Sequence, residues 1–316
     1  MAWAVVVAVS PTTAADANAD AGADVRQRDE VLRSQHWRPL SAAAHIFSRW
    51  GDMRVDKGMQ FPSFDELVDS YGSPPPPAVE RAAQSPQSPP ATPLLLPQPE
   101  RTALDDTLFR RYTGRNFDAA AELPLATAAR LLQRAFGAQG EREMAPDAVV
   151  LKKLSPSAGG LHPTEAYVLA QRIEGVAPGL YHYHPVKHAL EPWRQMDTGA
   201  TAELALRMVA DQEWFVAAPM MVVLAARVER NFWKYRNHAK AYRALLLDAG
   251  HLSQTFYLLA TEAGMPAFVT AAVNEIDIER ALGLDPLKDM VVAVCGCGPA
   301  SGAQDTVELR YEPPSP

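Results

Sequence analysis

The most informative part of this 316-residue chain reads Ser155-Pro-Ser-Ala-Gly-Gly-Leu-His-Pro-Thr-Glu-Ala-Tyr167. It begins with turn-forming residues and continues into an apolar strand pattern at 166–170. Gly159 and Gly160 lack a Cβ, so the backbone there can reach positive φ and lie close to a planar or phosphorylated ligand. Prolines on both sides stiffen the turn. The pattern alone fits either a cofactor-binding loop or an ordinary Gly-rich loop.

Composition is typical of a globular protein of enzyme size. Hydrophobic residues make up 47% of the chain and charged residues 21%, and the length suits one large domain with a smaller region attached. The net charge of −7 and the pI near 5.6 argue against a general nucleic-acid binder and against a protein held on anionic membranes. No apolar run approaches the roughly 18 residues that a membrane span requires.

The N-terminus and the cysteines each allow two interpretations. The apolar residues Met1 to Val9 could be a signal-peptide core or a strand, but a secretory signal starts with positive charge and the first basic residue here is Arg26. We therefore expect a cytoplasmic protein whose first residues form a strand. Cys295 and Cys297 are the only cysteines and share one face of a Val-rich strand. Two such thiols make neither a zinc site nor a C-x-x-C motif, so we expect buried apolar side chains and no metal.

A Pro/Ser/Gln-rich passage divides the chain, and we predict a linker over residues 73–103. Such composition cannot bury a core and favours extended conformations. Before it, residues 1–72 form a small N-terminal region with helical spacing at Leu40–Trp50 and a capping-box pattern at Ser63 and Glu66. This region either docks on the main domain or binds a partner or peptide, and the pattern leaves both open.

The main domain is predicted at residues 104–300, with a C-terminal tail at 301–316. Apolar periodicity and turn signals predict helices at Leu125–Phe136, Tyr242–Glu262 and Asp277–Leu282, and strands at Tyr167–Ala170, Pro219–Ala225 and Met290–Val294. Helices interleaved with strands indicate an α+β or α/β sandwich.

A basic motif, Arg110-Arg-Tyr-Thr-Gly-Arg-Asn-Phe-Asp118, precedes the first predicted helix of this domain. Alternate residues of an extended chain point the same way, so Arg111, Thr113 and Arg115 can converge on one anion. A solvated basic turn is the alternative interpretation.

A second polar cluster reads Asn231-Phe-Trp-Lys-Tyr-Arg-Asn-His-Ala-Lys-Ala-Tyr-Arg243, and Asp248-Ala-Gly-His-Leu-Ser-Gln254 follows it inside the long helix. The cluster is rich in groups that donate, accept or stack, although a solvated basic helix start would explain it equally well. We expect His251 to be a hydrogen-bonded core or interface histidine and not a base, because apolar residues surround it in the helix.

Taken in order, these motifs resemble those of the SagB/ThcOx-type azoline dehydrogenases in the nitroreductase superfamily, and in particular a subgroup of peptide maturation dehydrogenases. The resemblance covers Leu108 to Gly298 and rests on Arg-x-Thr-x-Arg, Ser-x-Gly-Gly-Leu-His-Pro, Lys-Tyr and Ala-Gly-His. The chain departs from the family pattern at His162, where tyrosine is common. Tyr112 and Gly114 vary the arginine motif. No basic residue follows Gly298 until Arg310, so the late cationic phosphate contact of many nitroreductases is not expected here.

The resemblance implies an α+β fold, namely a three-layer α/β/α sandwich with a mixed or antiparallel sheet. It also implies a homodimer that binds FMN at the subunit interface. The implied cofactor-binding residues are Arg111, Thr113, Arg115, Ser157, Gly159, Gly160, Thr270, Ala271 and Ala272. The implied partners are a precursor peptide and a cyclodehydratase.

The implied activity is the oxidation of thiazoline or oxazoline rings to azoles in a ribosomally made peptide, with Lys234 and Tyr235 as the catalytic pair. Ordinary tyrosine and lysine side chains titrate near pH 10, and a cation beside a phenol stabilises the phenolate. Tyr235 is therefore the expected base and Lys234 its activator, with the reverse order open. Two rivals also stay open: an NAD(P)H-dependent nitroreductase or quinone reductase, and a flavin-free homologue that binds precursor peptide as a scaffold.

Overall fold

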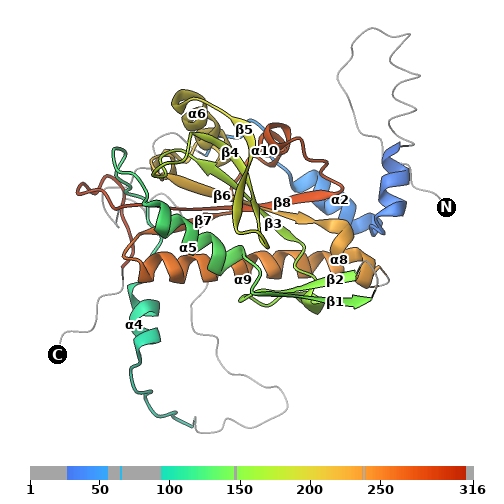
Figure 1. Cartoon of the computed structure of the whole chain (residues 1–316), viewed down its shortest axis with the longest axis horizontal. Coiled ribbons are helices and arrows are strands. Elements are labelled where there is room, and N and C mark those ends of the chain that lie inside the picture. The colour runs from blue at the N-terminus through green and yellow to red at the C-terminus, as the bar shows by residue number, and fades with distance from the viewer. Residues whose placement is uncertain are drawn as a thin grey trace.

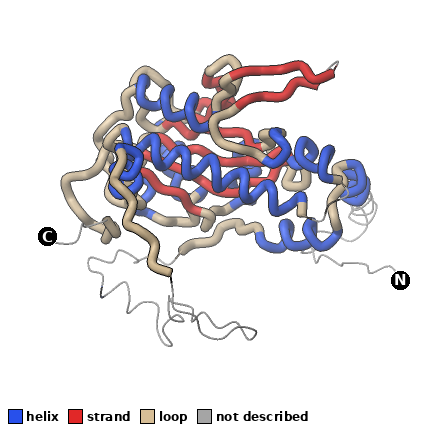
Figure 2. Tube along the Cα trace, turned by 90° about the horizontal axis from the view of Figure 1, so that it is seen from below, coloured by secondary structure: helices blue, strands red, loops and turns tan. Residues whose placement is uncertain are grey.

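The main domain is built on one six-stranded sheet in the order β5-β4-β3-β6-β8-β7, and every neighbouring pair is antiparallel. The computed structural model describes residues 27–55, 65, 94–145, 148–236, 238 and 240–310. The strands of the sheet are β3 (Thr164–Ala170), β4 (Gly179–His184), β5 (Ala189–Gln195), β6 (Met220–Arg227), β7 (Ala267–Thr270) and β8 (Asp289–Cys297). A separate hairpin of β1 (Gly140–Ala145) and β2 (Ala148–Lys152) projects from the body (Figure 2).

Helices cover both faces of the sheet, so the domain has three layers (Figure 1). One face carries α5 (Leu125–Phe136) and α9 (Ala241–Glu262), and the other carries α6 (Thr198–Met208), α7 (Glu213–Val216) and α10 (Glu275–Leu282). Side chains of β6 alternate between the two cores: Met220, Val222 and Leu224 pack under α5 and α9, and Met221, Val223 and Ala225 pack under the other helices. The predicted three-layer α/β/α sandwich with an antiparallel sheet is confirmed.

The strongly periodic elements lie where the sequence predicts them. Helix α5 has the predicted bounds, because its apolar stripe is buried and Gly137 follows its last residue; α9 begins one residue before the predicted start. The sequence did not predict the hairpin β1–β2, the strands β4 and β5 or helix α6. The predicted strand at residues 1–9, the capping box of Ser63 and Glu66, and linker residues 73–93 lie outside the described residues.

Both cysteines are buried, unpaired and packed in the core beneath α5 and α9, as expected. Burial raises the pKa of Cys297 to about 12 and that of Cys295 further, so both thiols are protonated at neutral pH. No group of metal-binding side chains occurs within the described residues. No helix in those same ranges is long and apolar enough to cross a membrane.

Two peripheral segments pack on the sandwich. From the N-terminal side, a helix at 27–34 and α2 (Pro39–Ser48) lie against α8 (Val228–Tyr235) and α9, with Trp37 and Ala42 in a shared buried cluster. Toward the C-terminus, Glu308 accepts from the Arg115 and Asn116 backbone amides, and the Asp305 and Thr306 amides donate to Asn116 Oδ1.

Candidate active site

The glycine loop, which we define as residues 155–162, contains a single turn of 3-10 helix at Ala158–Gly160. Gly159 and Gly160 have φ of 63° and 69°, in the left-handed region expected from the sequence. A Cβ built on Gly160 would meet no atom of the described chain within 4 Å. The backbone therefore faces open space, and a planar ligand could approach it closely.

Lys234 and Tyr235 lie at the end of α8, and their polar atoms meet this loop. A Cβ on Gly159 would lie 2.6 Å from Lys234 Nζ and 2.6 Å from Tyr235 Oη, so a side chain there would displace both groups, and the positive φ of Gly159 also favours glycine. Lys234 Nζ donates a hydrogen bond of 3.4 Å to the Gly159 carbonyl and lies 5.8 Å from the centre of the Tyr235 ring. Two motifs separated by 75 residues therefore form one cluster.

A buried carboxylate on α9 anchors the glycine loop. Asp248, which is 3% exposed, accepts hydrogen bonds from Ser157 Oγ at 2.5 Å and from the Ala158 amide at 3.0 Å. Ser157 Oγ in turn accepts from the His162 amide at 2.9 Å. The sequence analysis used Asp248 only as part of a helix signature and missed this role. The available signal was a lone acidic residue among the apolar positions of the helix.

Behind the loop lies a small cavity of about 10 Å³ lined by Lys153, Ser157, His162 and Asp248, among others. Lys153 is 5% exposed, and burial lowers its pKa to about 8. Burial, and then the positive charge of Lys153, lowers the pKa of His162 to about 4. His162 is therefore a neutral imidazole near pH 7, which makes it a weak base there.

His251 does not occupy the core. It is exposed, and its Nδ1 lies 3.3 Å from the Pro156 carbonyl. The core part of that prediction is wrong, because the apolar neighbours of His251 in sequence point to other sides of the helix.

The arginine motif, Arg111 to Arg115, runs beside β7. Thr113 forms a parallel bridge to Ala267, and its Oγ1 lies 3.0 Å from Tyr257 Oη. The Arg111 guanidinium lies 5.4 Å from the centre of the Tyr257 ring. Within the described ranges no carboxylate pairs with Arg111 or Arg115, so two cations are available to an anionic ligand.

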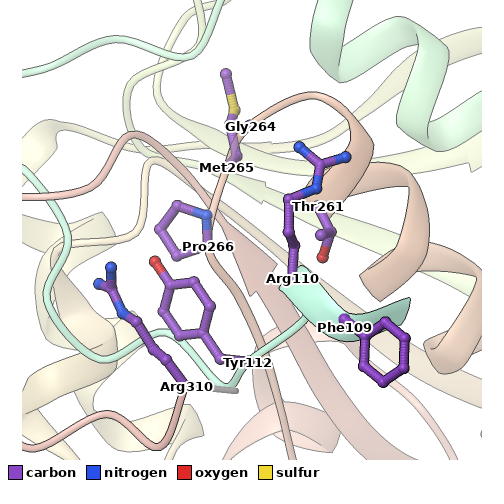
Figure 3. A pocket seen from close by; sticks show the side chains of 8 residues that line it. All are labelled: Phe109, Arg110, Tyr112, Thr261, Gly264, Met265, Pro266 and Arg310. Atoms are coloured by element: carbon purple, nitrogen blue, oxygen red, sulfur yellow. The ribbon is translucent and has the colours of Figure 1, made fainter. Parts of the chain in front are cut away.

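The C-terminal segment brings a third cation to the same motif. Glu308 accepts hydrogen bonds from the Arg115 and Asn116 amides at 2.6 and 3.0 Å. Arg310 pairs with Glu308 and lies 4.2 Å above the Tyr112 ring. A pocket of about 310 Å³ opens here (Figure 3), lined by Phe109, Arg110, Tyr112, Thr261, Gly264, Met265, Pro266 and Arg310. Arg310 is far from the arginine motif in the sequence, but it contacts Tyr112 of that motif in the fold.

The turn after β7 holds the remaining predicted residues. Thr270 is buried, and Gln212 binds both its hydroxyl and the Ala272 carbonyl, at 3.1 and 2.8 Å. Ala271 is exposed. The hydroxyl of Thr270, which also accepts from the Ala272 amide at 3.2 Å, thus fixes the turn.

The predicted site residues form two clusters on opposite flanks of α9. Asp248 binds the glycine loop and Tyr257 contacts the arginine motif. These two residues are nine positions apart, which is two and a half helical turns and roughly 14 Å along the axis. The solvent side of α9 carries Leu246 and Leu247, which are 45% and 64% exposed. One copy of the chain thus holds the two clusters at different levels of α9, whose solvent side carries two exposed leucines.

Comparisons with known proteins agree with this fold. The sequence profile of the nitroreductase family matches residues 108–298. The inferred nitroreductase MJ1384 of Methanocaldococcus jannaschii is 31% identical over 190 residues, which cover 60% of this chain and 88% of MJ1384.

A second relative is named for peptide processing. The microcin B17-processing protein McbC of Escherichia coli is 28% identical over 181 residues, which cover 56% of this chain and 62% of McbC, less than two thirds of that protein. A chain in the structure of the Escherichia coli microcin synthetase McbBCD complex with truncated pro-MccB17 bound shares the fold, with a TM-score of 0.60 and 21% identity over 86% of this chain and 97% of that chain. The resemblance to the nitroreductase superfamily is confirmed. The chain belongs to the nitroreductase family.

Proposed function

We propose that this protein is an FMN-dependent dehydrogenase that oxidises azoline rings to azoles in a ribosomally made peptide. The observation that carries the proposal is the meeting of Lys234 Nζ and Tyr235 Oη at Gly159, in a loop whose open backbone suits a planar cofactor. The name of the relative McbC supports a peptide as substrate. A precursor peptide and a cyclodehydratase are the proposed partners.

The residues present fit FMN. Two cations of the arginine motif, Arg111 and Arg115, match a phosphate, and Arg310 lies beside them in its pair with Glu308. The glycine loop leaves unobstructed space in front of Gly160, where a side chain would block a flat ring. When bound, FMN supplies the hydride acceptor for the oxidation.

The protein's own part in the reaction is to hold the ring and to move a proton. Removing a hydride from one ring carbon requires that a base take the proton from the neighbouring carbon. We assign that proton to Tyr235 Oη, and we assign to the Lys234 ammonium the stabilisation of the phenolate. The fixed glycine loop keeps both groups beside the cofactor space.

We propose a homodimer whose two copies complete each site, because each copy carries its two clusters of site residues on opposite flanks of α9. The exposed Leu246 and Leu247, which directly precede Asp248 on α9, supply an apolar surface for the second copy. Light scattering at micromolar concentration should show a dimer. A monomer that still retains its flavin would contradict this arrangement.

Arg111→Ala is expected to weaken FMN binding about tenfold or more, because a charge-assisted contact to phosphate contributes about 1.5–3 kcal/mol. Arg33→Ala is the matched control, since the Arg33 side chain is 79% exposed and pairs with Asp29 on the N-terminal helix. Flavin content after dilute dialysis measures the effect. Full occupancy in Arg111→Ala would remove Arg111 from the phosphate site.

The visible absorption spectrum of the purified protein tests the cofactor. Oxidised flavin bands at roughly 370 and 450 nm are expected. A colourless protein that cannot be reconstituted with FMN, yet binds peptide, would indicate a scaffold instead.

A further inference from the structure

Residues 37–55, here called the N-terminal strap, contact two parts of the candidate site that lie far apart in sequence. One end packs on α8, which carries Lys234 and Tyr235, and the other end binds the turn that follows Thr270–Ala272. The sequence left open whether the N-terminal region docks or binds a partner, and these contacts dock its residues 37–55 on the domain.

The first contact is aromatic. Trp37 is 7% exposed, and its ring meets Phe232 edge-to-face at 5.1 Å. Phe232 lies three residues before Tyr235 on α8, and both side chains belong to the cluster around Trp37. Trp37 Nε1 donates to the Leu287 carbonyl at 2.8 Å, so the indole is held from the opposite side as well.

His45 fixes the indole further. Its ring stacks on Trp37 at 5.5 Å with an interplanar angle of 11°, and its Nε2 lies 2.8 Å from the Pro286 carbonyl. Burial lowers the pKa of His45 to about 4, so the ring is neutral at physiological pH. A neutral ring can donate to that carbonyl without a buried charge.

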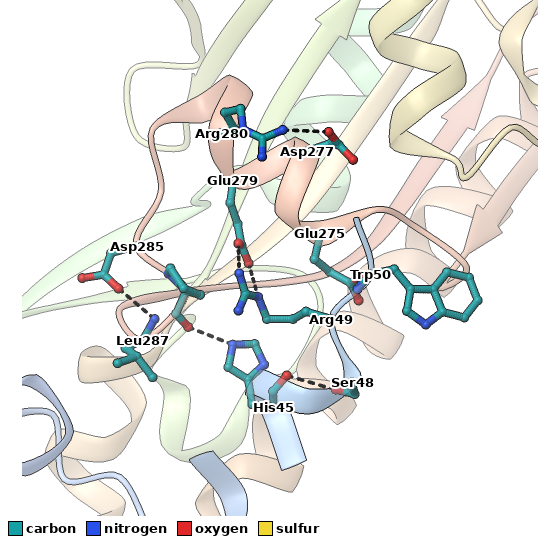
Figure 4. A network of polar contacts seen from close by, with 11 residues as sticks. His45, Ser48, Arg49, Trp50, Glu275, Asp277, Glu279, Arg280, Asp285 and Leu287 are labelled. Carbon is teal, nitrogen blue, oxygen red and sulfur yellow. Dashed lines mark hydrogen bonds and ion pairs between the residues drawn. The ribbon is translucent and has the colours of Figure 1, made fainter. Parts of the chain in front are cut away.

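The middle of the strap is tied to α10 by charged and polar groups (Figure 4). Arg49 forms a two-bond ion pair with Glu279, in which Nε lies 2.8 Å from Oε1 and the side chains are 13% and 5% exposed. The Trp50 amide donates to Glu275 Oε2 at 2.8 Å. A buried pair of this kind fixes the position of the chain, since shifting it would leave a carboxylate unpaired.

The far end holds the turn after β7. The Met53 amide donates to Asn274 Oδ1 at 3.0 Å, and Asn274 Nδ2 donates back to the Met53 carbonyl at 2.9 Å. Asn274 is 1% exposed and follows Ala272 by two residues. The strap therefore supplies one donor and one acceptor to a buried side-chain amide next to the predicted flavin contact, and this amide also donates to the Arg207 carbonyl.

We infer that the N-terminal strap is a positioning device for the active site, in which Trp37 holds the helix of the Lys234–Tyr235 pair and Met53 holds the turn after Thr270–Ala272. The inference rests on the proposed function only where it names the pair as catalytic. The inference predicts that α8 loses its fixed position when the Trp37 indole is removed.

Hydrogen exchange of the full-length purified protein, read by mass spectrometry, tests this without any substrate. In Trp37→Ala the amides of 228–236 should exchange at least about tenfold faster, while β3 and β6 keep their wild-type rates. Leu40→Ala is the control, because Leu40 lies in the same strap but is 87% exposed and should change nothing. Trp37→Phe, which keeps a ring against Phe232, should give a smaller increase in the same segment.

Unchanged exchange over 228–236 in both Trp37 variants would overturn the inference, and so would an increase spread evenly over the sheet. If Trp37→Ala does not fold, Trp37→Phe alone decides between these outcomes. With a cyclised peptide, a fall in kcat at little-changed KM should accompany faster exchange in α8. Faster exchange with unchanged kcat would uphold the strap and refute the catalytic role of the pair.

Discussion

Replacing Tyr235 with phenylalanine is expected to lower the oxidation rate of a cyclised peptide by about 10²–10⁴-fold, the range typical of a lost general base. The change removes only Oη, which faces Gly159, and keeps the ring that packs against the cluster of α8 and Trp37. Flavin content and melting temperature should therefore stay at wild-type values. Steady-state rates with peptide measure the loss of activity, the visible spectrum measures flavin content, and thermal unfolding gives the melting temperature.

The matched control is Tyr242→Phe, because Tyr242 is half-buried in the same cluster but does not reach the glycine loop. Lys234→Ala should resemble Tyr235→Phe, and the double variant should lose little more, since the two groups act as one unit. Wild-type rates in both single variants would show that the base lies elsewhere. His162 is a weak substitute, because its pKa near 4 leaves it a poor proton acceptor at neutral pH.

Asp248→Ala is expected to destabilise the protein by about 3 kcal/mol and to release bound flavin, because it removes a buried carboxylate that accepts from a partly buried hydroxyl and a partly buried amide. Both groups, Ser157 Oγ and the Ala158 amide, belong to the glycine loop. Thermal unfolding followed by calorimetry, and flavin retention on a desalting column, measure the two effects.

Asp248→Asn keeps the shape and one acceptor, so its effect should be smaller than that of Asp248→Ala. Ser253→Ala, on the same helix with a bond only to the Gly250 carbonyl, should leave stability and flavin unchanged. If Asp248→Ala melts like the wild type and keeps its flavin, the carboxylate does not anchor the loop.

The apolar periodicity of the sequence predicted the buried helices and strands well, because each of these elements has an apolar face within its own residues. Helix α5 and strands β3, β6 and β8 carry apolar faces that only a core can cover. The sequence did not predict the hairpin β1–β2 or the edge strand β5, because their side chains are largely exposed and their apolar alternation is weak.

The motifs of the site could be predicted, but the way they combine could not. Nothing local to Lys234 indicates that its ammonium reaches the Gly159 carbonyl, 75 residues away. The anchor Asp248 and the return of Arg310 to Tyr112 likewise depend on contacts between distant segments. Trp37 was missed for the same reason, since its hydrogen bond spans 250 residues.

The most direct test of the proposed function is mass spectrometry of a cyclised precursor peptide incubated in air with the purified protein, without any nicotinamide cofactor. The account predicts that the peptide loses two hydrogens for each azoline ring. An unchanged peptide mass, with the same flavin-loaded protein reducing a nitro compound or a quinone at the expense of NAD(P)H, would contradict it.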